Sequence, residues 1–330
     1  MDLRELISLL NGESYRSGEE LGERFGVSRT AVWKQLKKLD ALGVELDAVR
    51  GRGYRLKRPV EILDGKRMVE RLSREGRRRL SRLFVELEID STNTLLLGRF
   101  KHGAGHQEVC FAERQTASRG RRGRSFEVAL GSGLTFSLGW RFECAASALE
   151  GLSLAAGVAV AEALAAYNVD LMLKWPNDLL QRNAAGELEK VGGILVELQG
   201  DAEGPCDVVI GIGINVFDAP SLPPGQGLPA GYMAAQGGSL SRNALASSLI
   251  ESIGAMLESF AVEGFGPWQQ RWNQLNALAG EKITVYTGGT SYAAEAGGVD
   301  ERGILEVVTD SGVRRLAGGE VTLRPLHEPS

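Results

Sequence analysis

The chain has 330 residues, about two to three times the length of an ordinary domain, so we expect more than one folding unit. It is 43% hydrophobic and 24% charged, which is the composition of a globular protein and excludes a disordered or fibrous chain. Its three cysteines are widely spaced and odd in number, which argues against a disulfide framework and a cysteine zinc site and favours a reducing compartment.

The net charge of −4 is distributed unevenly along the chain. Residues 1–82 carry 20 Lys and Arg against 13 Asp and Glu, whereas residues 83–330 carry 18 against 29. A basic N-terminal part on an acidic body suggests that this part binds a polyanion, although many domains simply have a solvated basic face.

The start of the chain does not resemble a signal peptide, because residues 1–5 are already charged and amphipathic. The most apolar stretch, residues 151–167, is short, rich in Ala and Gly, and interrupted by Glu162. We therefore predict a buried helix there instead of a membrane span, and a cytoplasmic protein without membrane contact.

Three short helices are predicted in the first 42 residues. Apolar residues recur at helical spacing in the first one, at Leu3, Leu6, Ile7 and Leu10. Ser17 followed by Glu20 is a capping box that begins the second helix. Gly26 can adopt the left-handed conformation that ends this helix, and Ser28 then caps the third.

The third helix has one apolar and one polar side. Val32, Leu36 and Leu39 are predicted to face inward. The opposite side is polar and basic, and it consists of Arg29, Thr30, Trp33, Lys34 and Lys37. A helix, a tight turn and a second helix with such an outer side indicate a helix-turn-helix, whose second helix enters the DNA major groove.

Two short strands are predicted after these helices, at residues 44–49 and 53–56. The tip between them carries Arg50 and Arg52, so the pair resembles a wing that contacts phosphate. The alternative is a three-helix scaffold with a solvated basic side. We favour the DNA-binding reading because the polar side, the turn, the caps and the wing all agree.

Strands and helices mix after Pro59 and the turn at residues 64–65, which mark a boundary. Strands are predicted at 84–89, 109–113, 134–141, 171–174, 193–198 and 208–214, and helices at 92–100, 151–167 and 243–260. Residues 218–238 contain four prolines and are predicted to be a mobile connection. From residue 279, short alternating runs at 283–286, 291–296, 304–308 and 321–323 are separated by Gly-rich turns and predict a small barrel.

The segment Ser118–Arg124 holds four arginines within six residues. Guanidinium groups this close repel each other and cannot be buried unpaired. We therefore expect this Arg–Gly loop to be disordered until a phosphate or carboxylate binds. A basic RNA-binding or merely solubilising loop is the alternative.

Three further polar segments are candidates for ligand binding, each with a plainer alternative. Residues 90–93 lie at a strand-to-helix junction, where they can bind a ligand or only cap the helix. Residues 174–178 end a strand and carry a cation, an amide and a carboxylate, which can bind a ligand together. The plainer alternative is a proline turn with a surface ion pair. Lys190 is predicted at the beginning of a strand, where its ammonium group can bind a ligand. The plainer alternative is a lysine that is merely exposed to solvent at the end of a strand.

The segment Gly211–Asn215 is predicted to lie inside an apolar strand. It lacks the third glycine and the following acidic residue of a dinucleotide fingerprint, so we reject a Rossmann fold.

Taken together and in this order, these segments resemble the bifunctional biotin–protein ligases that also repress biotin-synthesis operons. The matching signatures are Ser91-Thr92-Asn93, Gln115, Arg119–Arg124, Lys174–Asp178, Lys190 with Gly193–Glu197, and Gly211–Asn215. The resemblance implies a multidomain α+β protein. It consists of a winged helix-turn-helix at residues 1–60, a class II synthetase-like ligase domain with a mixed sheet at 61–277, and an SH3-like barrel at 278–330.

The resemblance also implies a two-step ligase that uses ATP, biotin and Mg²⁺. Biotin and ATP would form biotinyl-5′-AMP, and biotin would then pass to a lysine of the biotin carboxyl carrier protein of acetyl-CoA carboxylase. With biotinyl-5′-AMP as corepressor, the protein would form a homodimer on operator DNA. A biotin-sensing repressor with little ligase activity and a lipoate-type ligase are the alternatives.

The resemblance assigns roles to individual residues. The biotin-binding residues would be Ser91, Thr92, Asn93, Gln115, Arg119, Gly120, Arg121 and Lys190. The ATP-binding residues would be Lys174, Asn177, Asp178, Asn215, Glu320 and Arg324. Lys190 and Arg121 would be catalytic, and Mg²⁺ would bind through the nucleotide, with no cage made of protein ligands alone. DNA would be bound by Arg29, Thr30, Trp33, Lys34, Lys37, Arg50 and Arg52.

The chain departs from the family pattern at a few positions. Ser118 stands where the family usually has the glycine that begins the Arg–Gly loop, and Phe126-Glu127-Val128 stand where a Trp and small residues are common. Gly192 stands where Ala is usual, and Thr135 where an aromatic residue is frequent. We expect these changes to alter the packing of the loop and the ligand affinity without removing an ionic group.

Overall fold

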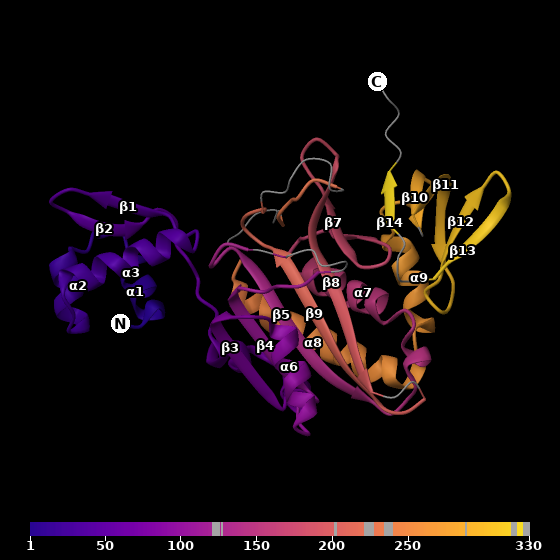
Figure 1. Ribbon diagram of the computed structural model, residues 1–330, viewed down its shortest axis with the longest axis horizontal. Helices are drawn as coiled ribbons and strands as arrows, with labels where there is room; N and C mark the ends of the chain where they lie inside the picture. Colours follow the sequence, from indigo (N-terminus) through magenta and orange to yellow (C-terminus); the bar gives the residue numbers. More distant parts are fainter. Residues whose placement is uncertain are drawn as a thin grey trace.

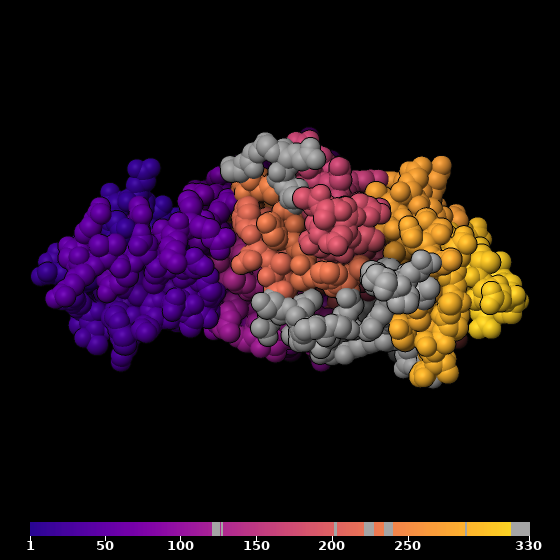
Figure 2. Space-filling view, turned by 90° about the horizontal axis from the view of Figure 1, so that it is seen from above, coloured from indigo at the N-terminus to yellow at the C-terminus, as the bar shows by residue number. Residues whose placement is uncertain are grey.

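The computed structural model describes residues 1–120, 126, 128–200, 203–220, 228–233, 240–287, 289–317 and 322–325, the last four as backbone only. Three parts follow one another along the long axis of the molecule (Figure 1). The N-terminal helices and the small C-terminal sheet lie at opposite ends, and the large central sheet lies between them, as Figure 2 also shows. The predicted fold class is confirmed.

The N-terminal part is a winged helix-turn-helix. It consists of α1 (Leu3–Leu10), α2 (Gly18–Phe25), α3 (Arg29–Ala41), β1 (Leu46–Val49) and β2 (Gly53–Leu56). The predicted caps are present: Ser17 Oγ accepts from the Glu20 amide at 3.0 Å, and Ser28 Oγ accepts from the Ala31 amide at 3.2 Å. Gly26 ends α2 with φ +63°, a conformation that favours glycine. The helices and the wing therefore follow the sequence prediction.

The N-terminal part has its own small core, to which the central part contributes the buried Leu130 and the partly buried Ile62 and Leu87. Leu130 is 3% exposed and packs among the apolar side chains of the three helices. Its amide donates to the Leu42 carbonyl, just after α3, at 3.1 Å. The Arg4 guanidinium donates to the carbonyls of Leu63 and Val85, at 2.6 and 2.9 Å. These contacts attach the winged helix to the central sheet.

The central part is a seven-stranded mixed sheet in the order β3-β4-β5-β9-β8-β7-β6. Its strands are β3 (Arg82–Ile89), β4 (Glu108–Gln115), β5 (Gly133–Phe142), β6 (Met172–Lys174), β7 (Asp178–Arg182), β8 (Leu188–Gly200) and β9 (Cys206–Asn215). Only β3 and β4 pair in parallel; the other pairs are antiparallel. Because parallel neighbours need a crossover, α6 (Thr92–Lys101) connects β3 to β4.

The two faces of the sheet are covered by different helices (Figure 1). On one face, α6 packs its Leu96 and Phe100 against Cys110 and Val209. On the other face, α7 (Leu152–Ala165) and α8 (Arg242–Glu263) pack on β8 and β5 and on each other. Side chains alternate between the faces along each strand, so β4 and β9 contribute to both cores.

The helix predicted at residues 151–167 is the buried helix α7. Among the described residues, two stretches are long and apolar enough to cross a membrane by length and composition, Ala146–Ala165 and Arg242–Glu263. More than half of each lies inside the protein, so both are core helices here.

Several elements differ from the sequence prediction. Lys190 does not lie at the mouth of its strand, because β8 begins two residues earlier and pairs with β7 through a bulge. Among the described residues, six further elements were not predicted: α4 (Gly65–Arg71), α5 (Arg74–Arg78), the 3₁₀ helix η2 (Ala146–Leu149), β7, α9 (Gly266–Leu275) and β13 (Gly312–Leu316). The predicted mobile stretch 218–238 falls largely outside the described residues.

The C-terminal part is a five-stranded antiparallel sheet in the order β13-β12-β11-β10-β14. Its other strands are β10 (Lys282–Thr287), β11 (Thr290–Val299), β12 (Leu305–Thr309) and β14 (Thr322–Pro325). The short runs predicted from the sequence are thus strands of one small sheet. The Trp175 indole donates to the Gly303 carbonyl at 3.1 Å and joins this sheet to the central part.

Candidate functional site

A chain of buried polar side chains lies at the N-terminus of α6. Ser91 caps this helix, and Ser91, Thr92 and Asn93 are all 3–4% exposed. The Thr92 amide donates to Gln115 Oε1 at 2.8 Å, and the Thr92 hydroxyl lies 2.6 Å from the hydroxyl of Ser137. Ser137 in turn donates to Asn93 Oδ1 at 2.5 Å. The structure therefore brings together the predicted biotin-binding residues of α6 and β4.

The chain of polar side chains continues to the beginning of the Arg–Gly loop. Asn93 Nδ2 donates to Glu197 Oε2 at 2.6 Å. The Arg119 guanidinium donates to the Thr94 hydroxyl at 3.0 Å and lies 3.5 Å from Glu197 Oε2. Glu197 on β8 thus contacts both a predicted pocket residue and the first cation of the loop.

Ser137 and Glu197 are polar residues of the site to which the sequence assigned no role. Ser137 lies in the middle of β5, which carries no recognisable motif, and it is 0% exposed. Glu197 belongs to a matching signature, but nothing in the sequence indicates that it reaches Asn93. Only the order of the strands places these residues together.

The glycines of β9 let other groups approach the sheet closely. A Cβ atom at Gly211 would lie 2.4 Å from Asn93 Oδ1, and one at Gly213 would lie 2.5 Å from the Phe126 ring. At the neighbouring position on β8, a Cβ at Gly192 would lie 2.5 Å from the Gly213 carbonyl. Bare backbone is therefore needed in this part of the sheet, which explains why Gly192 replaces the usual Ala.

The base of the Arg–Gly loop is closed by a hydrogen bond. Ser118, which replaces the usual glycine, accepts from the Phe126 amide at 2.8 Å through its hydroxyl. Gly120 is half-buried and is the last described residue before the gap. Arg121 and the rest of the cation cluster lie outside the described residues, so the expected ordering of this loop by an anion stays a prediction.

Two lysines share one carboxylate on the adjoining strands β6, β7 and β8 of the same sheet. Lys174 Nζ donates to Asp178 Oδ2 at 2.6 Å, and Lys190 Nζ donates to Asp178 Oδ1. Burial by itself would raise the pKa of Asp178, but the two ammonium groups outweigh it and hold that pKa well below its usual range. The cluster therefore carries one net positive charge and attracts an anion.

The two asparagines of the predicted nucleotide side differ in their surroundings. Asn177 Nδ2 donates to the Ile194 carbonyl at 2.7 Å and holds the turn after β6 against β8. Asn215 is 2% exposed, and its Nδ2 donates to the Gly231 carbonyl at 2.8 Å. Its Oδ1 is buried without a hydrogen-bond partner among the described residues. A buried acceptor without a donor is costly and suits a ligand that supplies an N–H group.

The described residues contain no group of three or more His, Cys, Asp or Glu side chains that could hold a metal ion. The one buried carboxylate of the pocket, Asp178, is already neutralised by its two lysines. Glu320 lies outside the described residues. Arg324 lies on β14 opposite Thr284, and only its backbone is described.

All seven predicted DNA-binding residues are exposed. Five lie on α3, and Arg50 and Arg52 lie at the tip of the wing. The wing is held at its base by Tyr15, whose hydroxyl donates to Asp47 at 2.5 Å and whose ring lies 4.5 Å from the Arg52 guanidinium. The structure therefore places the seven residues on one helix and its adjoining hairpin.

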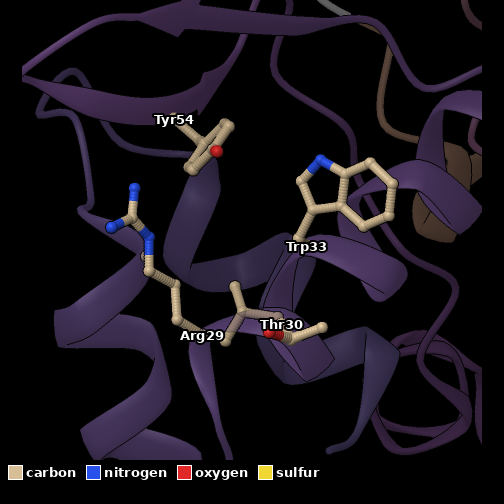
Figure 3. A pocket seen from close by; sticks show the side chains of 6 residues that line it. Arg29, Thr30, Trp33 and Tyr54 are labelled. Atoms are coloured by element: carbon tan, nitrogen blue, oxygen red, sulfur yellow. The ribbon is translucent and has the colours of Figure 1, made fainter.

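A recess of about 240 Å³ lies between α3 and the wing (Figure 3). It is lined by Gly18, Arg29, Thr30, Val32, Trp33 and Tyr54. In Figure 3 the Arg29, Thr30 and Trp33 side chains of α3 and the Tyr54 ring of β2 surround it. Basic and aromatic groups thus meet on the exposed side of the helix-turn-helix.

Comparisons with known proteins give separate matches for the helix-turn-helix and for the central part with its polar residues. Residues 2–55 match the HTH domain family, and residues 86–215 match the Biotin/lipoate A/B protein ligase family. The bifunctional ligase/repressor BirA of Escherichia coli (strain K12) is 36% identical over 97% of this chain and 96% of its own length. The biotin–[acetyl-CoA-carboxylase] ligase of Paracoccus denitrificans is 30% identical over 69% of this chain and 91% of its own length.

A solved structure matches three quarters of the chain. It is the biotin protein ligase of Aquifex aeolicus in complex with biotin and ATP, with a TM-score of 0.61 and 25% identity. The match covers 75% of this chain and 100% of that one.

Proposed function

This chain belongs to the family of bifunctional biotin ligases and DNA-binding repressors, and we propose that it acts through one bound ligand. This ligand would form at the polar residues of the central part and would also control DNA binding by the basic N-terminal part. The chain is a biotin–protein ligase and repressor. The observation that carries the proposal is the polar chain from Gln115 to Arg119, together with the cationic cluster of Lys174, Asp178 and Lys190 on the adjoining strands β6, β7 and β8 of the same sheet.

In the first step, the biotin carboxylate attacks the α-phosphorus of ATP. A bond forms between the carboxylate oxygen and that phosphorus, the bond to the bridging oxygen breaks, and diphosphate leaves, giving biotinyl-5′-AMP. Two anions must meet, so the site needs cations held in place before the reaction. Arg119, Arg121 and Lys190 would supply them, with Lys190 polarising the carboxylate and acyl-phosphate oxygens. Mg²⁺ would arrive bound to the nucleotide phosphates and neutralise part of their charge.

The pocket side chains would hold the two substrates in orientation. Ser91, Thr92, Asn93 and Gln115, with the backbone at Gly120, would bind the ureido group of biotin and its neighbours. On the other side, Lys174, Asn177, Asp178 and Asn215 would bind the nucleotide, with Glu320 and Arg324 reaching it from the C-terminal part. The unpartnered Oδ1 of Asn215 supports this assignment, because the exocyclic amino group of adenine is a donor.

In the second step, a lysine of the biotin carboxyl carrier protein attacks the acyl carbon of biotinyl-5′-AMP. An amide forms and AMP leaves with the electron pair of the broken acyl–oxygen bond. The attacking amine must first lose a proton, because its ordinary pKa is about 10.4. The mixed anhydride is prone to hydrolysis, so we expect the Arg–Gly loop to close over it and exclude water.

The adenylate would also control DNA binding. With biotinyl-5′-AMP bound, the loops next to the sheet edge would become ordered and favour a homodimer. Two winged helices would then contact the two half-sites of a palindromic operator in the cytoplasm. Biotin transfer to the carrier protein and repression of the biotin genes would in this way depend on the same bound ligand, biotinyl-5′-AMP.

The ligase proposal is tested by incubating the protein with ATP, biotin and an isolated carrier domain, followed by mass spectrometry of the carrier. We expect a biotinyl adduct on one lysine and none with lipoate in place of biotin. An adduct with lipoate alone would overturn the choice of substrate. No adduct with either acid, together with tight biotin binding, would identify a sensing repressor instead.

The repressor proposal is tested by measuring operator affinity and molecular mass with and without biotin plus ATP. We expect both ligands together to produce a dimer and to strengthen DNA binding. The affinity should fall steeply as salt rises, because phosphate contacts release counterions. Equal affinity in the presence and absence of the ligands would remove the switch while leaving the ligase intact.

A further inference from the structure

Trp33 is an aromatic residue at the centre of an otherwise basic surface. It lies on the outer side of α3, and 51% of it is exposed. Arg29 and Thr30 precede it on this side of the helix, and Lys37 follows it by one turn, with its Nζ 5.4 Å from the centre of the indole ring. An indole held in water among cations adds nothing to the core, so it is available for a partner.

The charge around Trp33 indicates what that partner is. Lys34 and Lys37 on α3 and Arg50 and Arg52 on the wing are all exposed, so both elements that flank the recess at the indole carry positive charge. The recess lined by Thr30, Trp33 and Tyr54 lies between α3 and the wing, with Arg29 at its side (Figure 3). A polyanion that carries a small apolar group fits this surface, and duplex DNA read from its major groove is such a ligand.

An indole reads DNA differently from the polar residues of recognition helices. Its N–H is a donor only, so it cannot recognise a base edge by paired hydrogen bonds as Arg or Asn does. The apolar group that a base pair presents in the major groove is the 5-methyl of thymine. Thr30 lies three residues before Trp33 and thus adjacent to it on the helix surface, where its own methyl group is also suited to such a contact.

We propose that Trp33, with Thr30, recognises the 5-methyl group of one thymine in each half-site of the operator. Trp33 is therefore a specificity-determining residue, whereas Lys34 and Lys37 contact phosphate and add affinity to any sequence. The proposal rests on the DNA-binding function proposed above and names the group that is read.

The test removes one methyl group from the DNA. An operator is first selected from random duplexes with the full-length protein, biotin and ATP. Each thymine of one half-site is then replaced by deoxyuridine, which lacks only the 5-methyl, and Kd is measured for each duplex. One substitution should weaken binding about fourfold, the loss expected for one buried methyl group, and the others should have no effect.

Protein variants show which side chain is responsible. Trp33→Ala should bind the thymine operator more weakly and keep only the small thymine–uracil difference that Thr30 contributes, while Trp33→Leu should keep more of it. Circular dichroism establishes that both variants fold. Lys34→Ala is the matched control, and it should weaken binding to both duplexes while keeping their fourfold ratio.

The outcomes separate this inference from the function on which it rests. If no duplex is selected, the DNA-binding proposal itself fails. If an operator is selected but no deoxyuridine weakens binding, or if the full fourfold weakening persists in Trp33→Ala, only the thymine inference is overturned. Unchanged operator affinity of Trp33→Ala would likewise overturn it and leave the indole to another kind of partner.

Discussion

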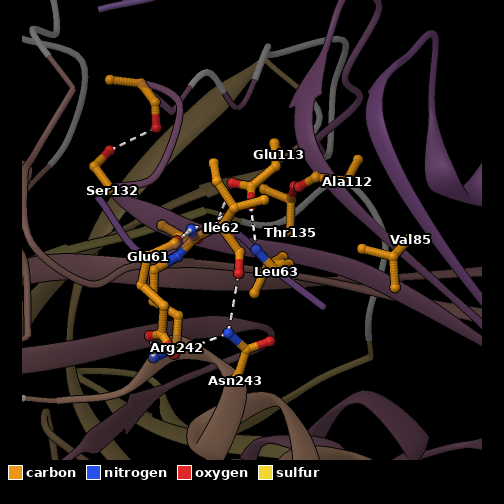
Figure 4. A network of polar contacts seen from close by, with 12 residues as sticks. Glu61, Ile62, Leu63, Val85, Ala112, Glu113, Ser132, Thr135, Arg242 and Asn243 are labelled. Atoms are coloured by element: carbon orange, nitrogen blue, oxygen red, sulfur yellow. Dashed lines mark hydrogen bonds and ion pairs between the residues drawn. The ribbon is translucent and has the colours of Figure 1, made fainter. Parts of the chain in front are cut away.

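The Arg242 guanidinium and the Glu113 carboxylate form an ion pair in the interior of the central part, with Nη2 and Oε2 2.7 Å apart and side chains 1% and 0% exposed (Figure 4). Arg242 also donates to the carbonyls of Gly133 and Glu61, at 2.9 and 2.6 Å. Glu113 accepts from the Leu63 amide at 2.6 Å. The pair thus joins α8, β4 and the segment that follows the winged helix.

Removing one member of this pair should strongly destabilise the central part. Arg242→Met leaves the Glu113 carboxylate buried without a cation, at a cost of about 3–5 kcal/mol in unfolding free energy. Calorimetry of the unfolding transition measures this loss. Arg24→Met is the control, because its partner Glu5 and Arg24 itself are 44% and 62% exposed and such pairs contribute about 0–1 kcal/mol. A loss equal to that of the control would show that the buried pair is not needed.

Glu197 should affect biotin binding through its two partners. Glu197→Gln keeps an oxygen acceptor for Asn93 but removes the charge opposite Arg119, so KM for biotin should rise about two- to fivefold, as for a partly exposed ion pair. Glu197→Ala should raise it further, because the buried Asn93 amide then lacks an acceptor. Initial rates at varied biotin measure both effects. Glu88→Gln, which breaks the exposed pair with Arg114 on the same sheet, should leave KM unchanged.

Arg121 should retain the adenylate. Losing one charge-assisted hydrogen bond of about 1.5–3 kcal/mol should speed release of biotinyl-5′-AMP by about 10- to 100-fold in Arg121→Gly. Release is measured as the labelled adenylate lost from the protein after dilution. Arg122→Gly, the neighbouring cation with no assigned role, is the control. Unchanged release from Arg121→Gly would count against this role.

Asp178 should make stability depend on pH in acid. Its pKa is lower in the folded protein than in the unfolded chain, so it contributes stability above the unfolded value of about 3.9, and this contribution is lost as pH falls below it. Asp178→Asn should therefore be less stable than the wild type at pH 7, and the difference should shrink between about pH 4 and 3. Urea unfolding at several pH values measures it. A difference that stays constant down to pH 3 would contradict the low pKa.

The local elements of this protein are determined by the sequence itself. Ser17 and Ser28 begin α2 and α3, and Gly26 ends α2. Their hydrogen bonds reach only three or four residues along the chain, so the sequence by itself predicts these helix ends. The strand containing Gly211–Asn215 was also correctly predicted, because its apolar run lacks the exit into a helix. Domain boundaries and the roles of the site residues stay predictions from the sequence.

The partners within the site were decided only by the tertiary structure. Ser137, Asn93 and Glu197 come from β5, α6 and β8, and they meet because the sheet places β5, β9 and β8 side by side. Asp178 lies between Lys174 and Lys190 because β7, which was not predicted from the sequence, forms a hairpin with each neighbouring strand. Hydrogen bonds across strands depend on pairing order and register, which local residue patterns do not specify.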